Sequence, residues 1–259
     1  MNNRKNTTIF ILGFLAILSL LTVFVLADSD MPYPVRYIEN VSSSRPTISN
    51  TSDTTQWVAA GNVSEINLTT ISTTKAWAGF YGNITGVLTL EDSLGYVFYN
   101  WTTLEPKGEI YASPNTTIGW LEISCFEFDG SAGNFNVDEA ESRFGIQDDD
   151  EDGINETFTD DTNLEFRVGT VTITANTCPA TNTYTLGSQK VDGDFENVLL
   201  TDNDALIFTT IIENNEVDLS ADINGFDGRP HDFQLMVAEN GQDGQEDTLT
   251  PYYFWAEIE

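Results

Sequence analysis

The sequence predicts an all-β fold, an antiparallel β-sandwich of two packed sheets that follows an N-terminal export helix. After residue 57, short runs rich in Val, Ile, Thr, Tyr, Phe and Trp follow one another, and Gly, Asn and Asp separate them. Convincing amphipathic helices are absent from this region. Of the 259 residues, 40% are hydrophobic and 12% are aromatic, which is enough to bury a sizeable core.

Residues 1–27 have the pattern of an export segment. Arg4 and Lys5 precede a run of nineteen uncharged residues, 9–27. The small side chains that end this run fit a secretory cleavage site after Ala27. A helix of this length would also span about 28 Å, close to the thickness of a bilayer core, so the segment can instead stay as a membrane anchor. In both cases we expect the rest of the chain to lie outside the cytoplasmic membrane.

Residues 28–56 form a Pro-, Ser- and Thr-rich stretch with few large apolar side chains. This composition predicts a linker or an N-terminal arm, in which only residues 35–38 have strand-forming character. As an arm, this strand can pair with a sheet edge of another copy and build a filament. As a linker, the stretch is a disordered tether or a stalk above the membrane.

A single β-sandwich domain is predicted for residues 57–259. It begins with a hairpin of residues 76–90 and 96–103 around an acidic turn that glycine closes. A bulged strand follows at residues 164–174, where the alternation of apolar side chains changes phase at Gly169. Four further strands are predicted at residues 195–200, 205–212, 231–237 and 252–258.

An acidic insert at residues 137–161 holds eleven Asp and Glu against one Arg, and one short helix is predicted at residues 137–144. Residues 148–153 read D-x-D-x-D-G, the spacing that places carboxylates around Ca²⁺ in an EF-hand loop. Position twelve is Thr159 rather than Glu, so the loop is not an EF-hand. The predicted Ca²⁺ ligands are four carboxylates and one backbone carbonyl, from Asp148, Asp150, Asp152, Asp160 and Ile154. The alternatives are a solvated acidic loop and a general adaptation to high salt.

Charge and composition exclude several functions. With 41 acidic and 10 basic residues, the formal net charge is −31, and such a polyanion is repelled by nucleic-acid phosphates. One His and two Cys are too few for the usual zinc sites. No hydrolase, metalloprotease or phosphate-loop motif occurs, and His231 is expected to be an exposed strand residue rather than a general base. We therefore expect no enzyme, and no cofactor other than calcium.

Two features agree with export. The only cysteines, Cys125 and Cys178, predict a disulfide that would stabilise the fold by about 4 kcal/mol through loop closure. Nine N-x-[ST] sequons occur, seven of them between residues 40 and 115, although a chain rich in Thr and Asn also makes sequons incidentally. The predicted glycosylation sites beyond the export segment are Asn40, Asn50, Asn62, Asn67, Asn83, Asn100, Asn115 and Asn155.

Four blocks of sequence carry a resemblance to known proteins. They read AWAGFYGNITG at residues 76–86, NTCP at 176–179, GFDG at 225–228 and TPYYF at 250–254. In these blocks the chain resembles a group of exported archaeal cell-surface proteins of unestablished function that carry a WAGFYGN-type β-rich domain. The resemblance implies a secreted or surface-attached domain and transfers no catalytic or binding residue.

These observations together predict a non-catalytic structural or interaction protein of the archaeal cell exterior. Its expected partners are other surface proteins, glycans or copies of itself, and membrane contact is expected only through an uncleaved N-terminal segment. The alternative from a different class is a carbohydrate-binding module that uses Trp or Tyr faces, although aromatic residues at strand positions belong to the core more often. A hydrolase is a third alternative that no motif supports.

Overall fold

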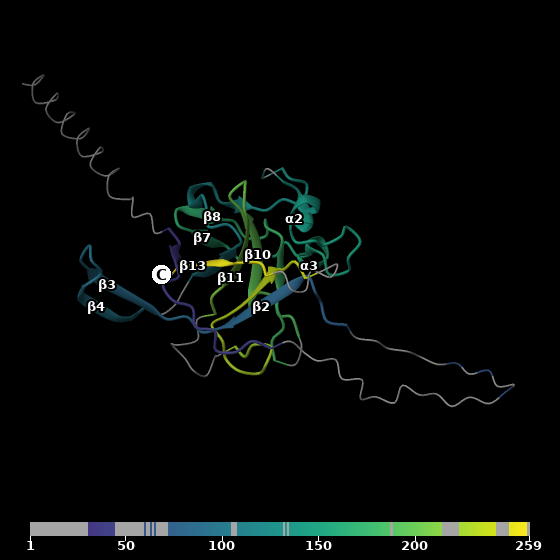
Figure 1. Ribbon diagram of the computed structural model, residues 1–259, viewed down its shortest axis with the longest axis horizontal. Helices are drawn as coiled ribbons and strands as arrows, with labels where there is room; N and C mark the ends of the chain where they lie inside the picture. The colour runs from purple at the N-terminus through teal and green to yellow at the C-terminus, as the bar shows by residue number, and fades with distance from the viewer. Residues whose placement is uncertain are drawn as a thin grey trace, which may run out of the picture.

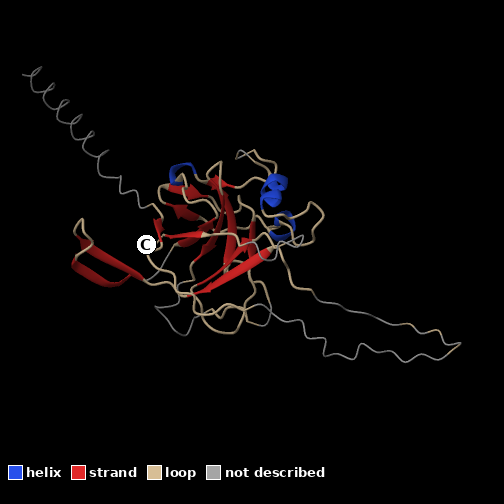
Figure 2. Cartoon of the chain, in the orientation of Figure 1, coloured by secondary structure: helices blue, strands red, loops and turns tan. Residues whose placement is uncertain are grey.

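The computed structural model describes residues 31–44, 60, 63, 65, 72–104, 108–131, 133, 135–186, 189–213, 223–241 and 249–257. Antiparallel strands dominate these residues, and the only helical elements among them are three short segments (Figure 2). The predicted all-β, antiparallel fold class is therefore confirmed. The predicted export helix lies outside the described residues, and no helix within them is long and apolar enough to cross a membrane.

A seven-stranded antiparallel sheet forms the centre of the molecule (Figure 1). Its strands follow the order β1-β13-β5-β11-β10-β6, and β9 also pairs with β10. Their bounds are β1 (Tyr33–Pro34), β5 (Glu109–Ser113), β6 (Ser124–Cys125), β9 (Ala180–Asn182), β10 (Glu196–Thr201), β11 (Leu206–Ile211) and β13 (Tyr253–Ala256). Every residue of β5 and β10 is buried, because other elements cover both faces of this sheet.

A two-stranded sheet packs on one face of the central sheet. It consists of β2 (Trp77–Gly82) and β12 (Phe233–Ala238), which pair along their whole length. Leu235 and Val237 of β12 share a core with Phe208 of β11 and with the acidic insert. The two packed sheets of the predicted sandwich are therefore unequal in size.

A short hairpin covers the opposite face of the central sheet. It is formed by β7 (Phe166–Val168) and β8 (Val171–Ile173), whose buried side chains share a second core with Tyr111 and Trp255. The prediction of one bulged strand was wrong here. The chain reverses at Gly169, which has a φ of 57°, and this turn restarts the apolar alternation.

The predicted first hairpin is divided between two sheets. Its first run ends at Gly82, where β2 stops, and a separate strand β3 (Gly86–Glu91) then pairs with β4 (Val97–Leu104). The acidic turn forms as predicted, since the Asp92 carboxylate accepts hydrogen bonds from the N–H groups of Leu94 and Tyr96, each at 2.9 Å. The β3–β4 hairpin projects from the body of the molecule (Figure 1).

The N-terminal arm is attached to the domain of its own chain. Tyr33 and Pro34 pair with the edge strand β13, and proline suits such an edge because it has no N–H to donate. Val35 N–H bonds to the carbonyl of Phe254 at 3.0 Å, and residues 35–38 form no strand, so the strand was predicted in the wrong place. In this structure the arm is paired with its own chain, and strand donation to another copy stays a prediction.

The acidic insert is folded against the core. The predicted helix is confirmed as α2 (Val137–Arg143), whose N-terminus Asn136 caps, and a second short helix, α3 (Ile154–Thr157), follows. Between the acidic residues, five apolar side chains are buried in the same core as β12: Ala140, Phe144, Ile146, Ile154 and Phe158. Most carboxylates of the insert, with the exception of the buried Glu141, consequently face solvent while apolar burial orders the backbone.

Candidate functional site

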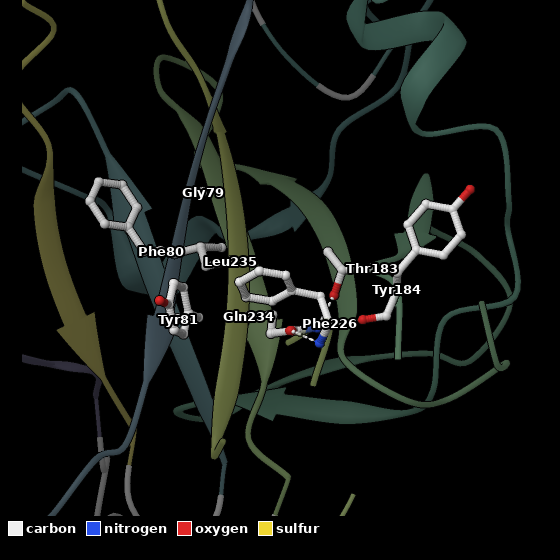
Figure 3. A pocket seen from close by; sticks show the side chains of 8 residues that line it. All are labelled: Gly79, Phe80, Tyr81, Thr183, Tyr184, Phe226, Gln234 and Leu235. Atoms are coloured by element: carbon white, nitrogen blue, oxygen red, sulfur yellow. Dashed lines mark hydrogen bonds between the residues drawn. The ribbon is translucent and has the colours of Figure 1, made fainter. Parts of the chain in front are cut away.

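An open groove lies over the two-stranded β2–β12 sheet (Figure 3). It encloses about 320 Å³, and its walls come from the loops that follow β9 and precede β12. The lining residues are Gly79, Phe80, Tyr81, Thr183, Tyr184, Phe226, Gln234 and Leu235. Two of the sequence blocks, at residues 76–86 and 225–228, therefore meet at one surface.

Gln234 holds both walls of the groove in place. Its side-chain amide donates to the hydroxyl of Thr183 at 2.6 Å and to the carbonyl of Tyr184 at 3.1 Å. Its Oε1 accepts the backbone N–H of Phe226 at 2.8 Å, so this buried amide is well satisfied. The approach of the second wall requires glycine at position 225, because a Cβ on Gly225 would lie 2.6 Å from Gln234 Oε1.

An aromatic ledge of Tyr81, Phe226 and His231 borders the groove. The ring of Tyr81 meets the other two rings edge to face, each with centroids 4.9 Å apart. Tyr81 is 47% exposed and Phe226 is 53% exposed. Beside Tyr81 the floor is open, since a Cβ on Gly79 would have no atom within 4 Å. Exposed rings beside an open floor suit the flat apolar face of a cyclic ligand.

His231 belongs to this ledge as a structural residue. Its Nε2 lies 2.9 Å from Asp227 Oδ1, and its side chain is only 11% exposed. The expectation of an exposed strand residue was therefore wrong, because His231 precedes β12 and is covered by Tyr81. Desolvation acts to raise the pKa of Asp227, but hydrogen bonds from the Arg229 N–H and from His231 outweigh it and lower this pKa.

Few polar groups border the groove, but some of them can form hydrogen bonds with a ligand. Within the described part of the chain, no hydrogen bond engages the hydroxyls of Tyr81 or Tyr184. The four described tryptophans lie elsewhere, since Trp77, Trp120 and Trp255 pack in or against the cores and Trp101 lies on the β3–β4 hairpin. Trp57 lies outside the described residues. A groove of this composition can stack on a ring and donate or accept a small number of hydrogen bonds.

A second cluster gathers three carboxylates of the acidic insert. Oxygen atoms of Asp138, Glu141 and Asp148 lie within 4.8 Å of one another, so this group could hold a cation. Among the predicted ligands it contains Asp148 alone. The D-x-D-x-D-G spacing missed the other two, although positions 138 and 141 share one face of the predicted helix and could have been found by their i, i+3 spacing.

The remaining predicted ligands have other partners. Asp150 Oδ2 accepts the N–H of Gln147 at 2.7 Å, and the Asp152 carboxylate accepts the hydroxyl of Thr74. The backbone of Asp160 forms an isolated bridge with Ala180. These carboxylates do not converge with Asp148 in the described cluster, and calcium binding stays a prediction.

Glu141 stabilises the start of α3. Its buried Oε1 accepts the N–H groups of Ile154 at 2.7 Å and Asn155 at 3.3 Å, donors that a helix N-terminus leaves without partners. Desolvation raises the pKa of Glu141, while these two hydrogen bonds act in the opposite direction. The carboxylate therefore has a structural role that does not require a cation.

The predicted disulfide is confirmed. The sulfurs of Cys125 and Cys178 are bonded, and their Cα atoms lie 4.9 Å apart. Cys125 belongs to β6, and Cys178 lies just before β9. Both strands pair with β10, so the bond joins two neighbours of the same central strand.

The asparagines of the predicted sequons differ from the other asparagines in solvent exposure. Five of the eight predicted sites are described, and all five are exposed: Asn40, Asn83, Asn100, Asn115 and Asn155. Asn50, Asn62 and Asn67 lie outside the described residues. Of the eight described asparagines that belong to no sequon, only Asn176 is exposed.

The fold and these surfaces define an all-β domain joined by a disulfide, with an aromatic groove and exposed sequons. Comparison with protein-family models, with curated proteins and with solved structures finds no match. The resemblance to exported archaeal proteins therefore stays a prediction from the sequence.

Proposed function

We propose that this protein is a non-catalytic glycoprotein of the cell exterior that acts through contacts of its surface. The main observation in its support is that every described sequon asparagine is exposed, whereas only Asn176 is exposed among the other described asparagines. Sequons that arose by chance would fall on buried and exposed asparagines alike. The Cys125–Cys178 bond supports the proposal, because disulfides persist mainly in oxidising extracellular compartments.

Glycopeptide mass spectrometry of the protein from its native host tests this proposal. We expect hexose-containing mass additions on peptides that carry Asn83, Asn100 and Asn115. Replacing Asn83→Gln should remove one glycan and leave the occupancy of Asn115 unchanged. An exported protein in which every described sequon is unmodified would contradict the proposal.

A second candidate function is carbohydrate binding in the aromatic groove. The specific observation is the Tyr81 and Phe226 ledge beside the open position at Gly79, together with the two available tyrosine hydroxyls. Sugar rings present an apolar face to aromatic rings and hydroxyl groups to polar side chains. The groove is open to solvent, so we expect weak, millimolar to micromolar binding.

A glycan array followed by titration calorimetry tests the groove. Tyr81→Ala and Phe226→Ala should each weaken binding by about tenfold, equivalent to about 1.4 kcal/mol. Tyr37→Ala is the matched control, because Tyr37 is an exposed tyrosine outside the groove. Binding that survives both groove variants would place the sugar elsewhere, and an array without any bound glycan would reject this candidate.

A further inference from the structure

The β3–β4 hairpin is an apolar element that the rest of the described chain leaves uncovered (Figures 1 and 2). Its exposed large side chains are Val87, Leu90, Leu94, Tyr96, Val97, Phe98, Tyr99 and Trp101, with exposed fractions from 48% for Trp101 to 85% for Phe98. An isolated two-stranded hairpin is marginal in water, and a contiguous exposed apolar surface marks an interaction site. Among the described residues, the hairpin is therefore a candidate interaction surface.

The two faces of the hairpin differ. Leu90 pairs with Tyr99, and the rings of Tyr99 and Trp101 are in contact at 4.9 Å, so these three side chains share one face. We call this set the hairpin face. Thr89 pairs with Asn100 on the opposite side, where Asn100 carries a sequon. The opposite side is mixed, because Glu91 pairs there with Val97, which is 54% exposed. The hairpin thus combines an uncharged aromatic face with a face that carries polar, charged and apolar side chains.

Charges on the hairpin are few and compensated. Residues 86–104 contain two charged side chains, Glu91 and Asp92. Arg36 donates two hydrogen bonds to Glu91, at 3.1 and 3.2 Å, and these bonds lower the pKa of Glu91. Asp92 accepts backbone N–H groups of the turn. Trp and Tyr are enriched where proteins meet the interfacial zone of a membrane.

Only a short connection separates the export segment from β1 in the sequence. The uncharged run ends at Ala27 and β1 begins at Tyr33, so residues 28–32 are the only connection. Five extended residues span at most about 18 Å. Arg36, four residues beyond this connection, contacts Glu91 of the hairpin, and β1 is fixed on β13. Because eight strand residues extend about 26 Å, the hairpin can reach a bilayer to which residues 9–27 are anchored.

We infer that residues 9–27 remain as an anchor and that the β3–β4 hairpin lies on the outer surface of the same membrane, with the hairpin face toward the lipid. This inference goes beyond the proposed glycoprotein role, and it adds a membrane contact outside the N-terminal segment. Asn100 then points away from the lipid, so a glycan on it is compatible with the contact. Since the net charge is −31, the contact depends on apolar burial and is stronger with zwitterionic than with anionic lipid at low salt.

Fluorescence quenching of the full chain in nanodiscs tests the inference. The discs contain phosphatidylcholine brominated on the acyl chain near the headgroup, which quenches a nearby indole. The quenched fraction should be larger for the wild type than for Trp101→Phe. Trp120→Phe is the control and should not lower the quenched fraction, because Trp120 packs against Tyr111 and Trp255 inside the domain.

Two neighbouring substitutions test which face is involved. Leu90→Asp places a carboxylate on the hairpin face, and Thr89→Asp places one on the opposite face of the same strand. We expect Leu90→Asp to remove the quenching that depends on Trp101 and Thr89→Asp to preserve it. Equal loss in both variants would overturn the assignment of the lipid-facing side.

Several outcomes would overturn the inference as a whole. The wild type and Trp101→Phe would be quenched equally if the hairpin does not touch lipid. Two chains per disc, with Trp101 shielded from the bromine, would show that a second copy covers the hairpin. A mature chain that begins at Asp28 and stays in the soluble fraction of its host would show that no anchor is retained, and it would leave the glycoprotein proposal intact.

Discussion

The indole N–H of Trp77 donates a hydrogen bond of 2.6 Å to the backbone carbonyl of Asp152, 75 residues further along the chain. The same ring packs against Phe158 of the acidic insert and against Phe208 of the central sheet. Trp77 therefore connects β2, the acidic insert and the central sheet at one point. An aromatic side chain therefore helps to hold a segment with a high density of negative charge.

Trp77→Phe should loosen the acidic insert selectively. The substitution keeps an aromatic ring but leaves the Asp152 carbonyl without its donor, so we expect the free energy of unfolding to fall by about 1 kcal/mol. Hydrogen exchange of residues 148–153 should accelerate. Trp120→Phe is the matched control, since no hydrogen bond of the Trp120 indole occurs among the described residues. Unchanged exchange in residues 148–153 would contradict this role of Trp77.

Loss of the disulfide should destabilise the whole domain. The double variant Cys125→Ala with Cys178→Ala opens a loop with a sequence separation of 53, and loop-closure entropy then predicts a loss of about 4 kcal/mol. Urea unfolding with and without reductant measures the effect. Reductant should bring the wild type down to the stability of the variant and should leave the variant unchanged. If the wild type is reduced, both thiols are completely alkylated and its stability to urea is unchanged, the stabilising role is disproved.

Glu213 should make stability depend on pH. Burial raises its pKa from 4.5 to about 7, and the carboxylates of Asp194 and Glu196 act in the same direction. A carboxyl with a raised pKa in the folded state contributes stability below its unfolded pKa, and this contribution is lost as the pH rises through 7. The expected loss between pH 4.5 and pH 7 is up to about 3 kcal/mol.

Glu213→Gln isolates this dependence. Glutamine keeps an oxygen that can accept the N–H of Phe195, which bonds to Glu213 Oε1 at 2.6 Å, but it does not titrate. We expect the stability curve of the variant to be flatter than that of the wild type between pH 4.5 and pH 8. Parallel curves would show that Glu213 titrates equally in the folded and unfolded states.

Calcium titration should distinguish the ligands that the sequence predicts from those that the fold gathers. If millimolar Ca²⁺ raises the melting midpoint, Asp148→Asn and Asp138→Asn should abolish the shift, because selective binding to the folded state stabilises by mass action. Asp152→Asn should preserve it, since Asp152 bonds to Thr74. A shift that molar KCl reproduces would identify charge screening, and a shift lost only in Asp152→Asn would support the sequence-based loop.

Much of the local structure follows from short stretches of sequence. The runs at residues 195–200 and 205–212 become β10 and β11, because β-branched and apolar residues on both sides of a turn form a buried hairpin. The turn at Asp92 and the capped helix α2 depend on side chains within four residues of the backbone groups that they bind. The cysteine pair was also predictable, because only one pairing exists.

The local sequence did not predict which strands pair with each other. Residues 77–82 pair with β12, more than 150 residues away in the sequence, instead of with the next strand. Alternation reports only that one face of a strand is buried, and it does not say which element covers that face. The division of the first predicted hairpin and the unequal sizes of the two sheets follow from this missing information.

The amino-acid sequence by itself thus determined the β-rich class, the disulfide and the positions of the sequons, since each depends on residue type and near neighbours. Only the tertiary structure decided that Tyr81 meets Phe226 in one groove and that Asp148 joins Asp138 rather than Asp152. These arrangements depend on contacts between segments far apart in the chain. The burial of Leu235, Ile154 and other apolar residues in a shared core selects those contacts, and the polar side chains are carried into place with them.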